Sequence, residues 1–172
     1  DGHLRWVSTT GAAVRDAVTN RVLRVAGSTA DITERKRAED GLRASESLKA
    51  AVIASSLDCI ITSDSEGRII EFNPAAERTF GYERSAALGR PIGDLIVPQA
   101  LRGRHAEGFQ RYLTTGQGTM LGRRVEIEAM RSDGAIFPVE LAITCVRLSG
   151  PPIFVAYLRD ITERKRAEEQ AR

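Results

Sequence analysis

His105 is the side chain in this sequence with the clearest potential for chemistry. Steps of three and four residues place Leu101, His105, Phe109 and Tyr112 on one face of a predicted helix. A histidine on such a face is usually a packed interior or rim side chain, but a neutral imidazole in the same place can also bind a metal or a cofactor. The residues alone leave both interpretations open.

The two cysteines, Cys59 and Cys145, lie in apolar strand-like runs. This placement is typical of reduced thiols in a hydrophobic core. The sequence contains no Cys-x-x-Cys pair and no Cys/His cluster that would indicate zinc. The pattern brings together neither a nucleophile with a base nor two carboxylates. We therefore assign no catalytic residue and expect this fragment not to be an enzyme.

The composition is that of an ordinary globular domain. The chain has 172 residues, of which 42% are hydrophobic and 28% charged, and its net charge is +2. This charge is too small, and the arginines are too dispersed, to predict nucleic-acid binding. The sequence has no leader and no apolar run of the roughly 18 residues that a membrane span needs. We expect a cytoplasmic piece of a longer protein, without membrane contact.

A nine-residue segment occurs twice in the chain. The copies are Asp31-Ile-Thr-Glu-Arg-Lys-Arg-Ala-Glu39 and Asp160-Ile-Thr-Glu-Arg-Lys-Arg-Ala-Glu168, at an offset of 160 − 31 = 129 residues. An offset of about one small domain indicates a tandem array of modules. Each copy follows an apolar strand-like run and begins a charged helical pattern. The repeated segment is therefore predicted to be the strand-to-helix exit of a module.

The repeats divide the chain into four parts. Residues 1–30 read as two strands, the C-terminal hairpin of an upstream module. Residues 31–55 read as a linker helix that Asp31 caps. Residues 56–160 form the main domain, and residues 161–172 begin an exit helix.

Within the main domain, two strands come first, then several short helices, and then three strands. The strands are expected at residues 57–62, 68–72, 125–130, 137–145 and 153–158. Asn73 and Pro74 begin a short helix, which Gly81 ends. A longer helix is expected from Pro98 to about Thr115. Segregated runs of this kind predict an α+β fold, an antiparallel sheet with helices on one face.

Three motifs in this domain resemble those of PAS domains. They are Asp64-x-Glu-Gly-Arg-Ile-Ile-Glu-Phe-Asn-Pro-Ala-Ala-Glu-Arg-x-Phe-Gly-Tyr82, Arg131-Ser-Asp-Gly-Ala-Ile-Phe-Pro-Val-Glu-Leu141 and Asp160-Ile-Thr-Glu-Arg-Lys. The resemblance covers residues 44–168, and residues 1–39 resemble the tail of another PAS domain. It implies a five-stranded antiparallel sheet cupping short helices around a pocket, flanked by N- and C-terminal signalling helices. It also implies a sensory module of a bacterial signalling protein, often a two-component histidine kinase or a cyclic-dinucleotide enzyme.

The helix around His105 is similar to the haem-binding helix of rhizobial oxygen-sensing PAS kinases. Carried over to this sequence, the similarity implies that His105 binds the haem iron and that Arg111 lies near a propionate. Met120, Leu141 and Ile143 would line the distal side. The other histidine, His3, lies in the upstream tail, so His105 is the expected ligand if haem enters the pocket.

The sequence departs from that haem-binding pattern at two positions. Val125 stands where those relatives carry a ligand-contacting arginine, and Thr119 replaces a polar histidine near the haem edge. Flavin photochemistry is not expected, because no cysteine lies between Ile60 and Thr144. The cofactor is therefore left open, with haem as the named candidate.

The predicted function is to sense a small ligand or partner and to relay the signal to a linked output domain. Asp160 is expected to cap the exit helix, Ile161 to anchor it in the core, and Thr162 to complete this relay. One alternative is a structural dimerisation and spacing module without a ligand. Another is a haem-based gas sensor.

The linker helix is expected to pair in a homodimer. It carries many charges and a sparse apolar stripe, which includes Leu42, Leu48 and Val52. Such a helix is marginal on its own, and pairing would bury the stripe. The alternative is that the helix lies back on its own sheet.

Overall fold

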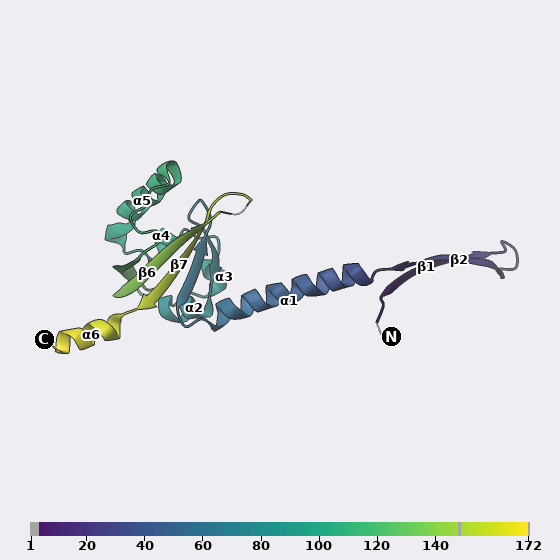
Figure 1. Ribbon diagram of the computed structural model, residues 1–172, viewed down its shortest axis with the longest axis horizontal. Coiled ribbons are helices and arrows are strands. Elements are labelled where there is room, and N and C mark those ends of the chain that lie inside the picture. Colours follow the sequence, from purple (N-terminus) through teal and green to yellow (C-terminus); the bar gives the residue numbers. More distant parts are fainter. Residues whose placement is uncertain (1–3, 148, 172) are drawn as a thin grey trace. The chain divides into compact units, whose positions relative to one another are not determined.

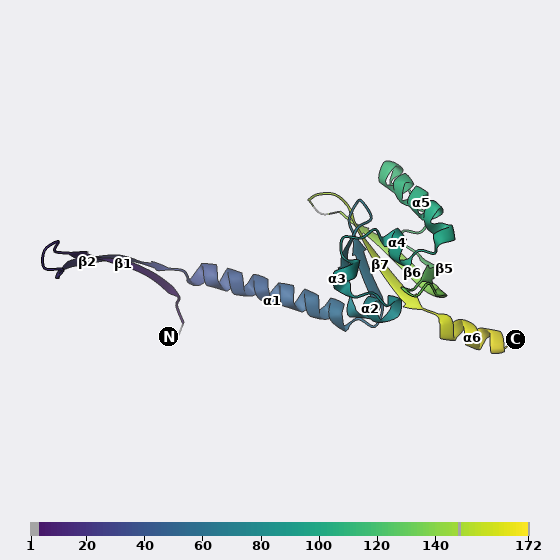
Figure 2. The same cartoon turned by 180° about the vertical axis from the view of Figure 1, so that it is seen from behind.

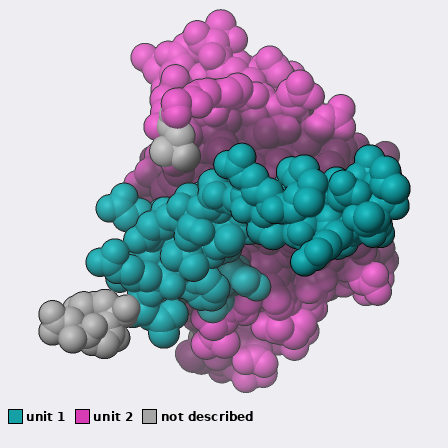
Figure 3. Space-filling model, turned by 90° about the vertical axis from the view of Figure 1, so that its right-hand side faces the viewer, with its two compact units in different colours: residues 1–51 teal, residues 52–172 magenta. Residues whose placement is uncertain are grey.

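The computed structural model describes residues 4–147 and 149–171. The chain forms two compact units, residues 1–51 and 52–172, which Figure 3 shows in different colours. Helix α1 (Thr33–Ser55) runs across the boundary between them. It begins two residues later than the sequence predicts, because Asp31 and Ile32 belong to the junction that precedes the first turn.

The first unit contains a two-stranded antiparallel hairpin. Strand β1 (Val7–Arg15) pairs with β2 (Val22–Asp31), and every residue of both strands is exposed. The turn is held by Asp16, whose carboxylate accepts hydrogen bonds from the backbone N–H groups of Val18 and Thr19. The two predicted strands are thus confirmed, with later ends than the sequence suggests. A lone hairpin of this kind is marginally stable in water.

The second unit is built on a five-stranded antiparallel sheet in the order β4-β3-β7-β6-β5. The strands are β3 (Cys59–Ser63), β4 (Ile69–Phe72), β5 (Arg124–Met130), β6 (Ile136–Val146) and β7 (Ile153–Asp160). All five predicted strands are confirmed. The last strand in the sequence, β7, lies between β3 and β6 and is therefore central (Figure 1). The chain consequently leaves the domain from the middle of its sheet.

Short helices cover one face of this sheet, as Figure 2 shows. The helices of the unit are α2 (Pro74–Phe80), α3 (Arg84–Ala87), α4 (Ile92–Ile96), α5 (Arg102–Thr115) and α6 (Thr162–Gln170). The core lies between the sheet and the short helices α2 to α4. Its fully buried members include Phe72, Phe80, Ile61, Leu95 and Val139. Alternating residues of β3, β6 and β7 supply the sheet side, as expected for a half-buried strand.

Helix α2 begins and ends as its sequence predicts. The Asn73 side chain accepts a hydrogen bond from the backbone N–H of Ala76, and Pro74 occupies the first turn. Gly81 ends the helix with a φ of 77°, a left-handed conformation that favours glycine. A Cβ at Gly81 would lie 2.5 Å from the Ser132 Oγ atom, so the α2 end closely approaches the turn after β5.

The long helix differs from its prediction at its beginning. Pro98 is followed by a 3-10 turn (Gln99–Leu101), and the regular helix α5 begins only at Arg102. It ends at Thr115, where Gly116 adopts a φ of 70°, as expected. None of the residues of α5 is fully buried, because this helix touches the rest of the unit along one side only.

Candidate functional site

The exit junction joins the central strand β7 to helix α6. The Asp160 carboxylate accepts hydrogen bonds from the backbone N–H of Thr162 at 2.8 Å and from its hydroxyl at 2.5 Å. Ile161 is 3% exposed, and its N–H donates to the carbonyl of Pro138 at 3.1 Å. The junction is thus fixed by one buried side chain and by a carboxylate that satisfies a free N–H at the helix start.

Arg131 connects this junction to the layer of short helices. Its guanidinium donates to the Asp160 carboxylate at 2.6 Å and to the backbone carbonyl of Thr79, which lies in the last turn of α2. It also lies over the Phe137 ring, 3.8 Å from the ring centroid, in a cation–π arrangement. Next to it, the Ser132 N–H donates to the carbonyl of Phe80. The Arg131 side chain therefore touches the last turn of α2, Phe137 on β6 and Asp160 at the end of β7.

The carboxylate of Asp160 is held in its charged form. Partial burial acts to raise its pKa, but hydrogen bonds from Thr162 and Arg131 outweigh this effect and leave the pKa below its ordinary value of 3.8. The link between Arg131 and Asp160 is therefore a charge-assisted hydrogen bond at neutral pH, stronger than a bond between neutral groups.

Ion pairs hold the first turn of α6 against its own sheet. The Glu126 carboxylate on β5 lies 2.5 Å from the Arg164 guanidinium and 2.5 Å from the Lys165 ammonium. Arg164 also lies 3.9 Å from Glu140 on β6. These charges are partly exposed, so each pair contributes little to stability by itself. Together they fix which face of α6 lies towards the sheet.

The first copy of the repeated segment repeats two hydrogen bonds of the exit junction. Ile32 donates its N–H to the carbonyl of Trp6, as Ile161 does to Pro138. Thr33 donates its N–H to the Asp31 carboxylate at 2.9 Å, which matches the Thr162–Asp160 bond. The two junctions thus share these two hydrogen bonds, whereas the threonine hydroxyls differ: that of Thr162 donates to Asp160, and that of Thr33 bonds with the backbone of Trp6.

His105 lies on α5 close to the short helix α4. Its ring stacks on that of Phe109, with 6.4 Å between the centroids and 13° between the planes, and Phe109 contacts Phe154 on β7. A Cβ built on Gly93 would lie 3.2 Å from the His105 Nδ1 atom. Much of the side chain is solvent-exposed, yet the surrounding protein lowers the pKa of the imidazole below 6.5 by desolvation. His105 is accordingly neutral at physiological pH, the form that can bind a metal.

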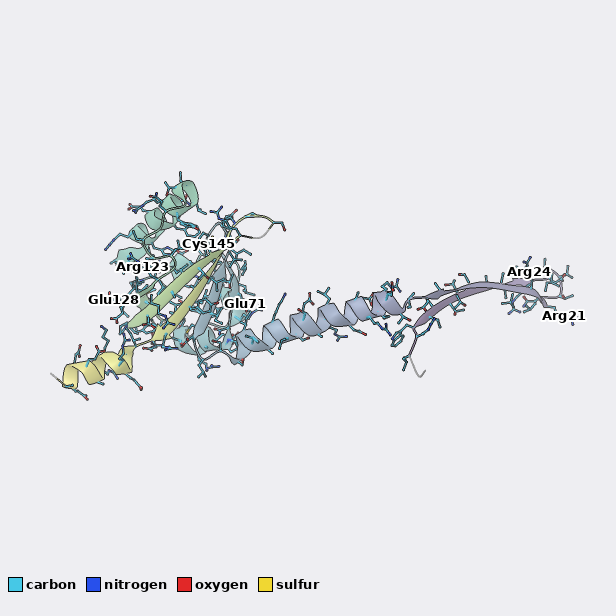
Figure 4. All side chains as sticks on the ribbon, in the orientation of Figure 1. Arg21, Arg24, Glu71, Arg123, Glu128 and Cys145 are labelled. Atoms are coloured by element: carbon cyan, nitrogen blue, oxygen red, sulfur yellow. The ribbon has the colours of Figure 1, made fainter. Side chains whose placement is uncertain are left out.

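A surface cavity of about 580 Å³ lies between the end of α5 and strand β6. This volume is within the range of small-molecule sites. Its lining residues are Tyr112, Gly116, Gln117, Gly118, Leu121, Gly122, Thr144 and Cys145. Figure 4 labels Cys145 near the end of β6. Apolar and polar groups both face the cavity, so it can offer a ligand both apolar contacts and hydrogen bonds.

The predicted haem-site residues do not line this cavity. Leu141 is 6% exposed and lies in the closed core, and Ile143 packs beside it. Met120 is 39% exposed in the loop after α5, while Arg111 is exposed on α5. His105 shares one face of α5 with Phe109 and Tyr112. Of these three residues, only Tyr112 lines the cavity. The chemistry of the neutral imidazole fits an iron ligand, and the haem assignment of these five residues stays a prediction.

The sequence profile of the PAS domain family matches residues 57–163, which is more than half of the chain. The chain belongs to the PAS domain family. The five strands, their order and the short helices on one face give the fold that the sequence motifs imply.

Two relatives of this PAS domain are sensor proteins. Sensor protein FixL of Bradyrhizobium diazoefficiens is 32% identical over 165 residues, which cover 95% of this chain and 32% of FixL. Oxygen sensor protein DosP of Escherichia coli K12 is 30% identical over 104 residues, which cover 60% of this chain and 13% of DosP. The chain thus spans a third or less of the length of these relatives. The similarities support a sensory, signal-transducing role for the domain.

A solved structure confirms the fold. The crystal structure of the PAS domain of an HTR-like protein from Haloarcula marismortui matches with a TM-score of 0.58 and 30% identity. The match covers 73% of this chain and 99% of that chain. The sheet and the short helices of the second unit are therefore a complete PAS domain core.

The predicted dimer residues lie on α1, outside this core. Leu42, Leu48 and Val52 are 62%, 66% and 61% exposed. The structure contains a single chain, so the predicted pairing of this stripe stays a prediction. His3, the second histidine, lies outside the described residues.

Two negative findings concern residues 4–147 and 149–171. None of their helices combines the length and hydropathy that crossing a bilayer requires. They also contain no group of three or more His, Cys, Asp or Glu side chains placed to bind a metal ion.

The sequence pattern missed Arg131 as a site residue. It is visible in the sequence only as the first residue of the Arg131-Ser-Asp-Gly turn motif. Its partners Thr79 and Asp160 are 52 and 29 residues away, so no local spacing predicts them. The one local signal for a role of Arg131 is the aromatic residue Phe137, which follows the turn six residues later and over which the guanidinium lies.

Proposed function

We propose that this PAS domain senses a small ligand or a partner and relays the signal through its exit junction to a covalently linked output domain. The observation that carries the proposal is the position of Arg131, which bonds both to the end of α2 and to Asp160. A shift of the short helices would move the Thr79 carbonyl, and Arg131 would transmit this movement to the first turn of α6.

The physical basis of the relay is a difference in rigidity between layers. The sheet is held by continuous ladders of backbone hydrogen bonds, whereas α2, α3 and α4 have only 7, 4 and 5 residues. Short helices with few internal bonds open at a lower free energy than a sheet. Ligand binding near them would therefore change their arrangement first, and the relay of Asp160, Ile161 and Thr162 would respond.

The cavity beside α5 is the proposed entrance for a small ligand. Its volume suits such a molecule, and its lining comes from the end of α5, the loop after it and β6. The output domain is proposed to be a histidine kinase or a cyclic-dinucleotide enzyme in the cytoplasm. A homodimer through α1 would place two such outputs side by side.

The relay is tested by Asp160→Ala in the parent protein. The N-cap residue of α6 is Ile161 rather than the predicted Asp160, but the Asp160 carboxylate still accepts the N–H of Thr162 in the first turn. Asp160→Ala removes this bond and the Arg131 partner, and loss of a comparable bond at a helix start costs about 1 kcal/mol. We expect the domain to stay folded while the output activity no longer differs between conditions that switch the native protein on and off. Asp133→Ala is the matched control, because this carboxylate bonds only within its own turn. A native switching ratio in Asp160→Ala would contradict the proposal.

A haem-based gas sensor is the second candidate. The observation that favours it is the lowered pKa of His105, which keeps the imidazole in the neutral form that can bind iron. No residue of its helix, α5, is fully buried, so His105 is not locked in the core. The similarity to FixL and to the oxygen sensor DosP points in the same direction. Haem, when bound, would supply a gas-binding iron, with His105 as its protein ligand. A movement of α5 and of the loop after it would then have to bring His105, Arg111 and Met120 towards Leu141 and Ile143 on β6.

A further inference from the structure

A second charged pair lies at the exit, one residue before Asp160. Arg159 forms two hydrogen bonds to the Asp58 carboxylate, each 2.8 Å long. This bidentate geometry is the strong and directional form of an arginine–carboxylate pair. Asp58 and Arg159 are cross-strand neighbours, since the β3–β7 register pairs Cys59 with Leu158. The pair therefore joins the beginning of β3 to the end of β7.

Asp58 is in turn tied to the incoming helix α1 by Asn73. The Asn73 side chain is 1% exposed and donates to the carbonyls of Ile53, in the last turn of α1, and of Asp58. Its oxygen accepts from the N–H groups of Ile60 and Ala76. All of its hydrogen-bonding capacity is used, so the end of α1 and the Asp58 backbone are held in one network.

We infer that Asp58 and Arg159 form a second relay, which couples the incoming helix α1 directly to the exit helix α6. The path runs from the last turn of α1 through Asn73 to Asp58, and from Arg159 to the junction at Asp160. This inference rests on the proposed function in one respect, namely that α6 is the path to the output. It adds a source of signal that does not pass through the ligand cavity.

The two relays act on opposite faces of the same strand end. Successive side chains of a strand alternate between faces, so Arg159 and Asp160 point in opposite directions. Asp160 bonds to Arg131 on the side of the short helices, while Arg159 bonds to Asp58 on the other face. In this proposal, Asp160 receives a signal from within the domain, and the adjacent Arg159 receives a signal from an upstream module.

A surface ion pair by itself would not support this inference, because most such pairs contribute little. The distinguishing feature is its place between the Asn73 network, which bonds to α1, and the residue that directly precedes Asp160 in the chain. The Glu71–Arg84 pair offers a matched comparison, since it is also bidentate, at 3.0 and 3.1 Å. It joins β4 to α3 and touches neither terminal helix (Glu71 is labelled in Figure 4). Its removal should leave the coupling intact.

The experiment is hydrogen–deuterium exchange on the 172-residue chain, read at the α6 amides from Lys165 onward. Ala51→Gly loosens α1 near its end and serves as the input. In the native background we expect it to speed exchange in α6 by roughly threefold or more, the size of a typical coupling between connected sites. In an Arg159→Gln background the same input should leave α6 exchange unchanged. In an Arg84→Gln background it should act as in the native chain.

Reversing the charges of the pair provides a rescue that a merely stabilising contact would not show. The double variant Asp58→Arg with Arg159→Asp should restore the response of α6 to Ala51→Gly. Exchange in the core strands β3 and β6 serves to exclude global unfolding. An equal response of α6 in the native and Arg159→Gln backgrounds would overturn the inference, and so would no response in the native chain. Neither outcome bears on the Arg131 relay, which Arg131 variants test separately.

Discussion

At the scale of single residues, the end of the last strand is held by carboxylates in charged form. The hydrogen bonds from Arg159 lower the pKa of Asp58, and those from Thr162 and Arg131 lower the pKa of Asp160 against the effect of burial. In the unfolded chain both groups return to ordinary values near 3.8. As the pH falls, these carboxylates take up protons in the unfolded chain before they do so in the folded chain. The two pairs therefore stabilise the fold at pH values above about 3.8, and this stabilisation is lost as the pH falls through the lowered pKa values of the folded state.

The pH dependence of unfolding follows from this difference. Between neutral pH and about pH 3, we expect the free energy of unfolding to fall, with at most about 1 kcal/mol due to the Asp58 pair because solvent screens it. Asp58→Asn should remove that share of the dependence. Urea unfolding at several pH values measures it. If the free energy of unfolding of Asp58→Asn depended on pH as strongly as that of the native chain, the Arg159 pair would not lower the pKa of Asp58 in the folded state.

His105 allows a direct test of the haem candidate. We expect protein produced with added haem to show a Soret band, and we expect His105→Ala to abolish it because the iron loses its protein ligand. His3→Ala, which changes the other histidine of the chain, is the control and should retain the band. Stoichiometric haem in His105→Ala would refute the assignment of the ligand. Absence of haem from the native chain would remove the gas-sensor candidate and leave the relay proposal standing.

At the scale of elements, local signals in the sequence predict where most helices and strands lie. Asn73, Pro74 and Gly81 fix the ends of α2 because capping acts within a few residues. The five strands of the sheet follow from alternating apolar positions. The start of α5 was predicted too early, because Pro98 and the residues after it also satisfy a 3-10 turn.

The exposed stripe on α1 gives a prediction about assembly. Leu48 is 66% exposed, and we expect it to be buried in a homodimer with Leu42 and Val52. Leu48→Glu would place a charge in that seam and should convert the dimer to a monomer. Ala50→Glu adds the same charge about half a helical turn away and should leave the dimer intact. Light scattering at tens of micromolar distinguishes the two states. A native chain that is already monomeric would contradict the predicted pairing.

At the scale of the whole molecule, the repeated segment defines the organisation. Both copies form equivalent backbone hydrogen bonds, from the Ile32 N–H to the Trp6 carbonyl and from the Ile161 N–H to the Pro138 carbonyl. We propose from this equivalence that residues 1–30 are the last hairpin of an upstream PAS domain. Valines 7, 14 and 25 on this hairpin are 59%, 55% and 70% exposed, as expected of strands whose covering layer is not part of the chain. Helix α1 would then be both the exit helix of one PAS domain and the incoming helix of the next.

The site is harder to predict from the sequence than the fold, because its side chains are far apart along the chain. Asp160 and Thr162 are two residues apart, so the sequence can predict that Asp160 bonds at the start of α6, although the N-cap residue is Ile161. Arg131 is 29 residues from Asp160, and Asp58 is 101 residues from Arg159. Such pairs arise only when the sheet order and register are known. The sequence therefore locates the exit, whereas the side chains that connect it to the rest of the domain require the structure.

In the proposed relay, the layer of short helices controls α6 through Arg131. Gly81→Ala provides an input without a ligand, because the added methyl group would lie 2.5 Å from the Ser132 Oγ atom and must displace the end of α2 or the turn after β5. The most direct measurement is hydrogen–deuterium exchange at the α6 amides of the 172-residue chain. We predict that Gly81→Ala speeds exchange there by roughly threefold or more in the native background and has no effect on α6 in an Arg131→Gln background. An equal effect in both backgrounds, or none in the native chain, would contradict the claim.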